Sequence, residues 1–443
     1  MLSTTNIRVS LLKKLNNVGD GKSLIRKVSL PFLLIALTML LSILSQITLA
    51  RLLGVDQYGE YVYVFSWAIL LCVPATLGLT TGSVRIIPQL SSDKKLAELG
   101  GFLKVAYFLP VLTAFIIALV FLYFINNFYD NGVILQAWLI GLLLIMPLNS
   151  LASVQGGILR GFKHATESQL SGVTESLVFI PLLFCAYLFY GESLSDSTAL
   201  IVKAFALFTS VIICSYFLRR CYTDDLRAAR VTYELRKWSR ISVPLLLFSG
   251  MSVLLRRSDI LMLGYFADNA DVGIYAAISR ISNLSALGIA AVNSVANPLI
   301  AGYFAQKNFT KLQKITTQSA RIVFATTLCL SLLILVGWRY LLLAFGADFV
   351  FGRDSLFILM AGQVIVSIIG PIGQLLIMTK YEKLSAIMLL GMTITNIVFN
   401  ALLIPIWGIT GAAIATSAAN LIWTFIFAFV IVRILPIRLS IFG

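Results

Sequence analysis

The chain of 443 residues is dominated by apolar side chains: 59% of its residues are hydrophobic and only 12% are charged. A water-soluble protein of this length needs far more polar side chains to cover its surface. The composition therefore excludes an ordinary soluble enzyme or binding domain and indicates a protein embedded in a lipid bilayer. The formal net charge of +15 must then be explained by where the basic residues lie.

The apolar residues fall into twelve blocks of about 20 residues, the length that an α-helix needs to cross a bilayer. In hydrocarbon every backbone polar group must be hydrogen-bonded, so blocks of this length predict helices rather than the shorter strands of a β-barrel. We therefore predict an all-α integral membrane protein. The predicted transmembrane helices are 29–50, 61–84, 102–125, 134–156, 168–190, 198–218, 241–265, 272–296, 321–345, 355–378, 384–404 and 410–433.

Lysine and arginine are retained on the cytoplasmic side of short loops. With the N-terminus inside, 27 of the 34 Lys and Arg residues lie on the cytoplasmic side. An even number of spans and this bias predict that both termini are cytoplasmic. Attraction to anionic membrane lipids then accounts for the excess of basic residues, and no nucleic-acid partner is expected. The seven remaining basic residues are Arg51, Lys203, Arg256, Arg257, Arg280, Arg339 and Arg353.

The residues outside the spans offer little chemistry. The tail 1–28 precedes an uncleaved first span, because that block is too long for a signal peptide; residues 7–15 are either an amphipathic surface helix or a solvated tail. The five cysteines form no CxxC pair and indicate no disulfides. His164 is the single histidine and lies in a loop, so no metal site or cofactor is expected.

The sequence resembles itself at an offset of about 213 residues, since VSLPFLL at 28–34 matches ISVPLLL at 241–247. Two further matches follow in the outer turns: Leu53-Gly54 with Leu263-Gly264, and Gly59-Glu60-Tyr61 with Gly273-Ile274-Tyr275. Chance similarity of leucine-rich spans is the alternative, but proline and glycine fix the registration where leucine does not.

Six predicted spans separate the two copies, so both copies point the same way and the repeat is parallel. Parallel repeats place the functional site between two lobes that rock against each other to give alternating access. The expected parts are a basic N-terminal tail (1–28), an N-terminal six-helix lobe (29–218), a basic cytoplasmic linker (219–240), a C-terminal six-helix lobe (241–433) and a cytoplasmic C-terminal tail (434–443).

Three arginines lie deep within two consecutive predicted spans. An arginine at mid-span costs about 2.5–3.5 kcal/mol on insertion scales, so it normally faces a cavity or a partner. Counted from the outer turn, Arg256 and Arg280 lie at a similar depth, roughly 10–12 Å below the surface at ~1.5 Å per residue. Asp259, one helical turn after Arg256, is expected to neutralise it. Arg257 and Arg280 would then form a positive pair suited to a phosphate, pyrophosphate or acidic sugar. The alternative is that these residues only cross-link helices or extend their charges to the surface.

Glu175 is the carboxylate that lies clearly within the spans of the N-terminal lobe. It is a candidate for ion coupling through a proton, or it hydrogen-bonds to Thr174 or a neighbouring helix. Lys203 and Arg339 lie near span ends and are expected to extend to the surface. The amides within the spans either line a sugar path or bond between helices: Gln46, Asn149, Gln155, Gln363, Gln374, Asn396 and Asn420.

The chain contains no phosphate-binding GKS or GKT motif and therefore no ATP motor of its own. The outer loops are short and lack histidine, which leaves no room for a catalytic domain. The sequence therefore predicts a secondary transporter and not an enzyme.

Several segments resemble the polysaccharide biosynthesis, or oligosaccharide, flippases (Wzx type) of the multidrug/oligosaccharidyl-lipid/polysaccharide (MOP) exporter superfamily. The likeness covers nearly the whole chain and is most specific in its last segment. The segments are ARLLGVDQYGEY (50–61), LGLTTGSVR (77–85), GILRGFKHA (157–165), RSDILMLGYFADNADVGIYAAISR (257–280) and LLIPIWGITGAAIAT (402–416).

The resemblance implies two six-helix lobes in a V shape, in the cytoplasmic (inner) membrane, that export undecaprenyl-pyrophosphate-linked oligosaccharide repeat units for surface polysaccharide or O-antigen of lipopolysaccharide. A basic lumen formed by Arg256, Arg257 and Arg280 would suit the pyrophosphate. The implied partners are the lipid-linked oligosaccharide and the polymerase and chain-length proteins of the same pathway, and we expect a monomer. The alternatives are a multidrug cation antiporter of the same superfamily, a peptidoglycan-precursor flippase, which usually carries two more spans, and a membrane-bound polysaccharide polymerase or ligase.

Overall fold

The computed structural model describes residues 21–128, 132–191, 194–370, 372–379 and 381–435, and all regular structure in these ranges is helical. Long apolar segments with few helix-breaking residues explain this, because a helix satisfies its own backbone in lipid. The tail residues 7–15 lie outside the described part of the chain.

The helices of the first half are α2 (Gly21–Ala75), α3 (Leu79–Ser92), α4 (Leu96–Phe128), α5 (Gly132–Ile140), which continues through a π-helical turn (Gly141–Ile145) into α6 (Met146–Gly161), α7 (Ala165–Tyr190) and α8 (Asp196–Cys221). The short α9 (Asp224–Ala228) lies in the connection. The second half contains α10 (Leu235–Phe266), α11 (Asn269–Asn283), α12 (Leu287–Ala305), α13 (Phe309–Phe345), α14 (Arg353–Ser367), α15 (Ile372–Met378) and α16 (Glu382–Ile434).

Ten stretches of the described helices are long and apolar enough to cross a membrane. Two of them are more than 50 residues long and each contains two of the predicted spans. The chain reverses within each one at a glycine with positive φ, Gly54 (φ 78°) in α2 and Gly408 (φ 51°) in α16, a conformation that glycine adopts without strain. A multi-pass helical membrane protein is therefore confirmed, whereas the total of twelve crossings stays a prediction.

Three predicted spans differ from the observed helices. The span 61–84 is interrupted at Thr76–Gly78, where a Cβ on Gly78 would overlap the backbone of Ser242 on α10. The span 272–296 divides into α11 and α12, and 355–378 divides into α14 and α15. Periodicity of apolar residues cannot locate such breaks, because both sides of each break are equally apolar.

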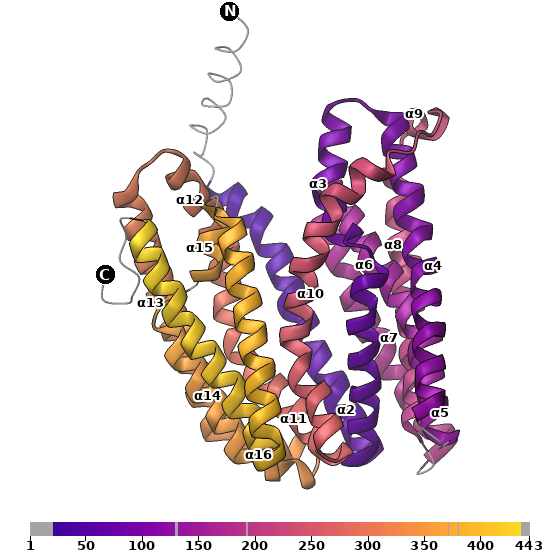
Figure 1. Ribbon diagram of the computed structural model, residues 1–443, viewed down its shortest axis with the longest axis vertical. Coiled ribbons are helices and arrows are strands. Elements are labelled where there is room, and N and C mark those ends of the chain that lie inside the picture. Colours follow the sequence, from indigo (N-terminus) through magenta and orange to yellow (C-terminus); the bar gives the residue numbers. More distant parts are fainter. Residues whose placement is uncertain (1–20, 129–131, 192–193, 371, 380, 436–443) are drawn as a thin grey trace, which may run out of the picture.

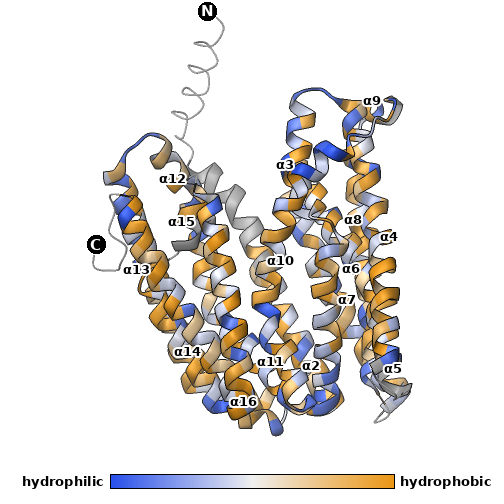
Figure 2. Ribbon diagram, viewed as in Figure 1, coloured by the Kyte–Doolittle hydropathy of each residue, from blue (hydrophilic) through white to orange (hydrophobic). Residues whose placement is uncertain are grey.

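The outer surface of the helices is apolar, as lipid contact requires. Phe108 on α4, Phe189 on α7 and Val336 on α13 are 73%, 88% and 83% exposed. Figure 2 shows this apolar character along α4, α13 and α16, with hydrophilic residues concentrated at the ends of the helices. The loops that were predicted to be cytoplasmic, including the one between α3 and α4 and the connection that contains α9, lie at one end of the molecule in Figure 1.

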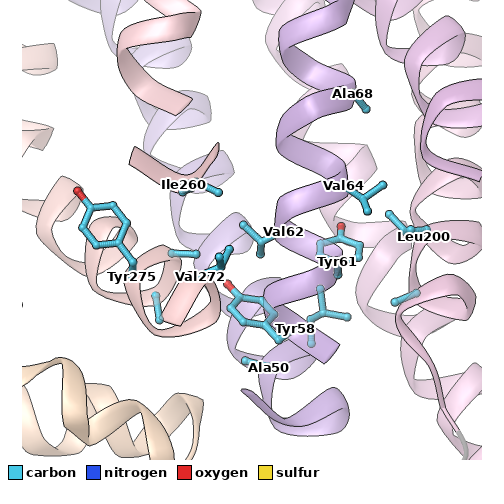
Figure 3. Close-up of a cluster of buried hydrophobic side chains, with 14 of the residues drawn as sticks. Ala50, Tyr58, Tyr61, Val62, Val64, Ala68, Leu200, Ile260, Val272 and Tyr275 are labelled. Atoms are coloured by element: carbon cyan, nitrogen blue, oxygen red, sulfur yellow. The ribbon is translucent and has the colours of Figure 1, made fainter. Parts of the chain in front are cut away.

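The two halves meet where α2 crosses α11 (Figure 1). Here the two glycines of the sequence repeat lie against each other's helix: a Cβ on Gly59 would overlap the carbonyl oxygen of Asn269, and one on Gly273 would lie 2.6 Å from the carbonyl oxygen of Val55. Around this crossing, Tyr58 and Tyr61 of α2 and Val272 of α11 are fully buried (Figure 3). Only glycine allows the two backbones to approach so closely.

A second contact joins the halves at the same end of the molecule. The guanidinium of Arg51 on α2 donates hydrogen bonds to the carbonyl oxygens of Leu343 (2.6 Å) and Ala344 (2.8 Å), near the C-terminal end of α13. These carbonyls have no partner within their own helix, so the arginine caps them. The Tyr58 ring also packs edge-on against Phe349, with centroids 5.8 Å apart.

Replacing Gly59 by alanine is expected to destabilise this arrangement by about 1–3 kcal/mol, because the added methyl group forces two packed backbones apart. The matched control is Gly100→Ala, also within a helix, where the nearest atom to the new Cβ would be 3.8 Å away. Thermal unfolding of the purified variants measures the difference. Equal midpoints for the two variants would contradict the tight crossing.

Candidate functional site

The five residues that the sequence singled out all line one cavity of about 560 Å³ between the halves. It is bounded by α2, α7 and α8 of the first half and by α10, α11, α14 and α16 of the second. Three of the predicted amides, Gln46, Gln363 and Asn420, also line it. The charged lining residues are Glu175, Lys203, Arg256, Arg257, Asp259 and Arg280.

The three arginines come from α10 and α11. Arg256 is exposed, whereas Arg257 and Arg280 are half-buried. Arg257 reaches across to α2, where its Nη1 lies 3.4 Å from Oγ of Ser66. The ion pairs found among the described residues include none of the three arginines. Their charges are therefore open to the cavity, where an anion can be bound by charge-assisted hydrogen bonds.

The expected pairing of Asp259 with Arg256 is wrong. Asp259 is only 7% exposed and its carboxylate faces α11 and α16. It accepts hydrogen bonds from four uncharged side chains: Tyr275 Oη (2.6 Å), Thr416 Oγ1 (2.6 Å), Asn400 Nδ2 (2.7 Å) and Asn396 Nδ2 (3.3 Å). A three-residue spacing places two residues on one helix face, but it does not determine which neighbouring helix each side chain contacts.

Glu175 forms an ion pair with Lys203, which joins α7 to α8. Thr174, the partner considered from the sequence, instead donates to the carbonyls of Leu170 and Ser171 within its own helix. The Lys203 ammonium also lies 5.1 Å from the ring centroid of Phe179 and 5.5 Å from that of Phe65, a favourable cation–π arrangement.

Sequence reasoning missed Lys203, which was expected to extend to the surface and is instead only 12% exposed at its side chain. Lys203 lies near the end of a predicted span, where a lysine side chain usually extends to the membrane surface. The signal that could have found it is the lone carboxylate Glu175 in the same lobe, because a buried carboxylate requires a partner. Asn396 was assigned to the amides in general, and the structure places it behind Asp259.

Lys203 and Glu175 neutralise each other, so the formal charge of the cavity is set by the three arginines and Asp259. The sum is positive. A smaller cavity of about 290 Å³ shares Ser42, Arg280 and Asn283 with the first and extends between α2, α7 and α11. Arg280 thus lines both cavities.

The chain is similar to known proteins in both sequence and fold. Residues 24–304 match the family model described as "Polysaccharide biosynthesis protein". The chain belongs to the polysaccharide biosynthesis protein family. Residues 241–402 also match the MatE family model. This match confirms the family that the sequence predicted. The named proteins and solved structures that the chain resembles are flippases and transporters, in line with the predicted transporter.

A curated relative is the "Probable low-salt glycan biosynthesis flippase Agl15" of Haloferax volcanii. It is 23% identical over 377 residues, which cover 83% of this chain and 75% of the relative.

Solved structures share the fold. A MATE family multidrug transporter of the MOP superfamily in its inward-facing conformation gives a TM-score of 0.72 at 15% identity, over 90% of this chain and 94% of that one. Its outward-facing counterpart gives 0.65 at 16% identity, over 93% and 95% of the two chains. A MOP superfamily transporter from Pyrococcus furiosus, described as having reversed polarity in its binding pocket, gives 0.64 at 16% identity, over 93% and 95%.

The Lys203–Glu175 pair is expected to stabilise the protein through mutual neutralisation. Lys203→Met or Glu175→Gln alone leaves one buried charge and should cost about 3–5 kcal/mol, whereas the double variant should recover most of that loss. The matched control is the pair Lys237–Glu98, at 2.8 Å but with 42% and 21% of the side chains exposed, for which solvent screening should leave little coupling.

Thermal or denaturant unfolding of the purified variants gives both double-mutant cycles. Additive effects of Lys203→Met and Glu175→Gln would show that the two charges do not depend on each other.

Proposed function

We propose that this flippase moves a lipid-linked oligosaccharide with an anionic phosphate or pyrophosphate link, such as an undecaprenyl-pyrophosphate-linked repeat unit, across the cytoplasmic membrane. One observation carries the proposal: Arg256, Arg257 and Arg280 line the cavity without an acidic partner among the described residues. An uncompensated positive charge inside a membrane protein is costly. Retaining three of them is explained if an anion enters the cavity.

Each part of such a substrate has a matching surface. The phosphate groups suit the guanidinium groups, which bind phosphate oxygens in pairs. The sugars suit the amides of Gln46, Gln363 and Asn420, which line the same cavity. The polyprenyl chain stays in the bilayer, as the apolar exterior of the helices allows.

The positive cavity also separates this proposal from the alternatives. A cation-drug exporter needs an anionic site, whereas the three arginines and Asp259 together give this cavity a positive formal charge. A peptidoglycan-precursor flippase carries the same kind of anionic link, so the sugar decides between the two; the family match to polysaccharide biosynthesis favours surface polysaccharide or O-antigen. The polymerase and chain-length proteins of that pathway would then receive the exported units, and we propose that the flippase itself acts as a monomer.

Alternating access requires the lobes, 29–218 and 241–433, to move against each other. We propose that the linker 219–240 holds them together on the cytoplasmic side. There, Thr232 N donates to the carbonyl of Ala97 (3.1 Å) and the Trp238 ring packs on Phe102 (5.4 Å between centroids). We propose that the Gly59–Gly273 crossing closes the opposite side and that the cavity opens toward the cytoplasm. Glu175 is retained as one candidate for ion coupling.

Replacing Arg257 or Arg280 by alanine should reduce glycan export at least tenfold, because each removes a charge-assisted hydrogen bond to the anion. Lysine at either position should restore part of the activity, since it keeps the charge but loses the paired geometry. Arg339→Ala is the control, because Arg339 is exposed and lies outside the cavity.

Complementation of a flippase-deficient bacterial strain provides the readout, with surface glycan and membrane protein level measured together. Wild-type glycan from both alanine variants would refute the anion site.

The orientation is tested in a variant whose five native cysteines are replaced by serine. Single cysteines at Asp271 and Asp348 should react with an impermeant thiol reagent added outside cells, and cysteines at Lys94 and Lys307 should not, because the positive-inside rule places the last two in the cytoplasm. Labelling with the reverse pattern would invert the proposed topology.

A further inference from the structure

Two exposed arginines of the second half lie outside the central cavity. Of the seven basic residues that the charge bias does not place on the cytoplasmic side, four line the cavity and Arg51 caps the end of α13. The other two are Arg339, near the end of α13, and Arg353, the first residue of α14. Both lie at the end of these helices that is opposite to the basic loops, where few lysines and arginines are expected.

An apolar groove of about 570 Å³ lies between α13 and α14. The two helices pack against each other along the second half (Figure 1). Ala361 and Ile365 are exposed, so the groove is open at the surface of the helices that lipid contacts. All its lining side chains are apolar: Leu328, Leu335, Phe357, Met360, Ala361, Val364 and Ile365.

Each arginine lies one helical turn beyond the groove. Arg339 follows Leu335 by four residues on α13, and a spacing of four places side chains on one face of a helix. Arg353 precedes Phe357 by the same four residues on α14. Trp338 joins the helices at this level, because its ring packs edge-on against Phe357 with centroids 6.0 Å apart. The guanidinium carbon of Arg353 lies 5.6 Å from the centroid of the same tryptophan ring. Both arginines therefore lie at one end of the groove.

The length of the groove is close to the depth of one membrane leaflet. Its lining residues span 328–335 of α13 and 357–365 of α14, which is about 10–12 Å at ~1.5 Å per residue. Half of the hydrocarbon core of a bilayer is roughly 15 Å. An extended acyl chain whose headgroup lies at the membrane surface would therefore fill the groove.

We infer that this groove, with Arg339 and Arg353 at its outer end, binds one anionic diacyl phospholipid such as phosphatidylglycerol. One acyl chain lies in the groove, and the two guanidinium groups donate hydrogen bonds to the phosphate. Trp338 lies at the level of the headgroup, a position that tryptophan favours in membrane proteins.

The charges at the outer end of the groove favour an anionic headgroup. Arg353 also pairs with Asp354 at 2.8 Å, but the two side chains are 51% and 69% exposed, and an exposed pair of this kind contributes little. A guanidinium has five N–H donors, so Arg353 can contact a phosphate as well. Two arginines and one aspartate leave a net positive charge, which a zwitterionic phospholipid does not neutralise.

One helix separates the proposed lipid from the central cavity. Leu359 and Gln363 of α14 line the cavity, whereas the adjacent Met360 and Val364 line the groove. A phospholipid in the groove therefore supports the cavity wall from outside and does not enter the transport path. Its loss is expected to lower the stability of the protein rather than to abolish export, and the inference does not depend on the transported glycan.

Photo-crosslinking of the purified full-length protein with a phosphatidylglycerol that carries a diazirine on one acyl chain tests the inference. Mass spectrometry should find the label within residues 328–335 and 357–365. Unlabelled phosphatidylglycerol should displace the probe at a concentration at least tenfold lower than phosphatidylethanolamine with the same acyl chains. The double variant Arg339→Gln/Arg353→Gln should weaken labelling at least tenfold, because it removes the charged donors. Ala361→Phe should also weaken it, because the ring fills the groove and leaves both charges in place.

Arg433→Gln is the matched control. Arg433 is exposed and lies over an aromatic ring, 5.1 Å from the centroid of Phe429, but on α16 and outside the groove. Labelling of the groove should be unchanged in this variant. Size-exclusion chromatography checks that each variant is folded. If the double variant is not, Ala361→Phe and the competition between the two phospholipids on the wild type decide the result.

Thermal unfolding gives a second readout. Added phosphatidylglycerol should raise the unfolding midpoint of the wild type more than that of Ala361→Phe, because a ligand stabilises the state that binds it. Equal displacement by the two phospholipids, or groove labelling that is unchanged in both Ala361→Phe and the double variant, would show only the lipid that surrounds any membrane helix and would overturn the inference.

Discussion

Placing charged side chains within the apolar part of a bilayer costs free energy, and this cost determines how the charged residues in the interior of the molecule are arranged. Each charge within the spanning region must be paired, be surrounded by dipoles, or face a water-filled space. All three solutions occur within one cavity. They divide its walls into regions with different chemistry, although the residues come from helices that are similar in composition.

The ion pair between Glu175 and Lys203 is the first of these solutions. The two charges cancel, so the part of the cavity wall that the first half contributes offers no net charge to a ligand. Asp259 shows the second solution, in which hydroxyl and amide dipoles stabilise a carboxylate without removing its charge. The arginines show the third, since they line the cavity and form no ion pair among the described residues.

The close crossing of α2 and α11 determines where that space can be. Gly59 and Gly273 let two backbones meet at one end of the molecule, and Arg51 adds a contact to the end of α13 at the same level. The halves are thereby closed on one side of the cavity. A transporter that alternates its access must separate this contact. The contact combines backbone proximity and two hydrogen bonds with buried apolar side chains from both halves, among them Tyr58, Val272 and Phe349, so its opening would expose that apolar surface.

The amino-acid sequence by itself determined the all-helical class, the positions of most spans, the repeat and the five residues that line the cavity. It could do so because the cost of polar groups in lipid acts on each segment independently of the rest of the fold: a block of apolar residues has to be a helix, and an arginine within it has to face a polar space. Gly59 and Gly273 were likewise visible as a repeated pair.

Only the tertiary structure decided which charges meet. Asp259 was assigned to Arg256 on the same helix, but its partners Tyr275, Asn400 and Thr416 are 16, 141 and 157 residues away in the chain. Lys203 was assigned to the surface, but it lies opposite Glu175 on a neighbouring helix. Periodicity determines the face of a helix on which a residue lies. What that face contacts is determined by the rotation and tilt of the helix against its neighbours. These depend on packing between segments that are distant in sequence.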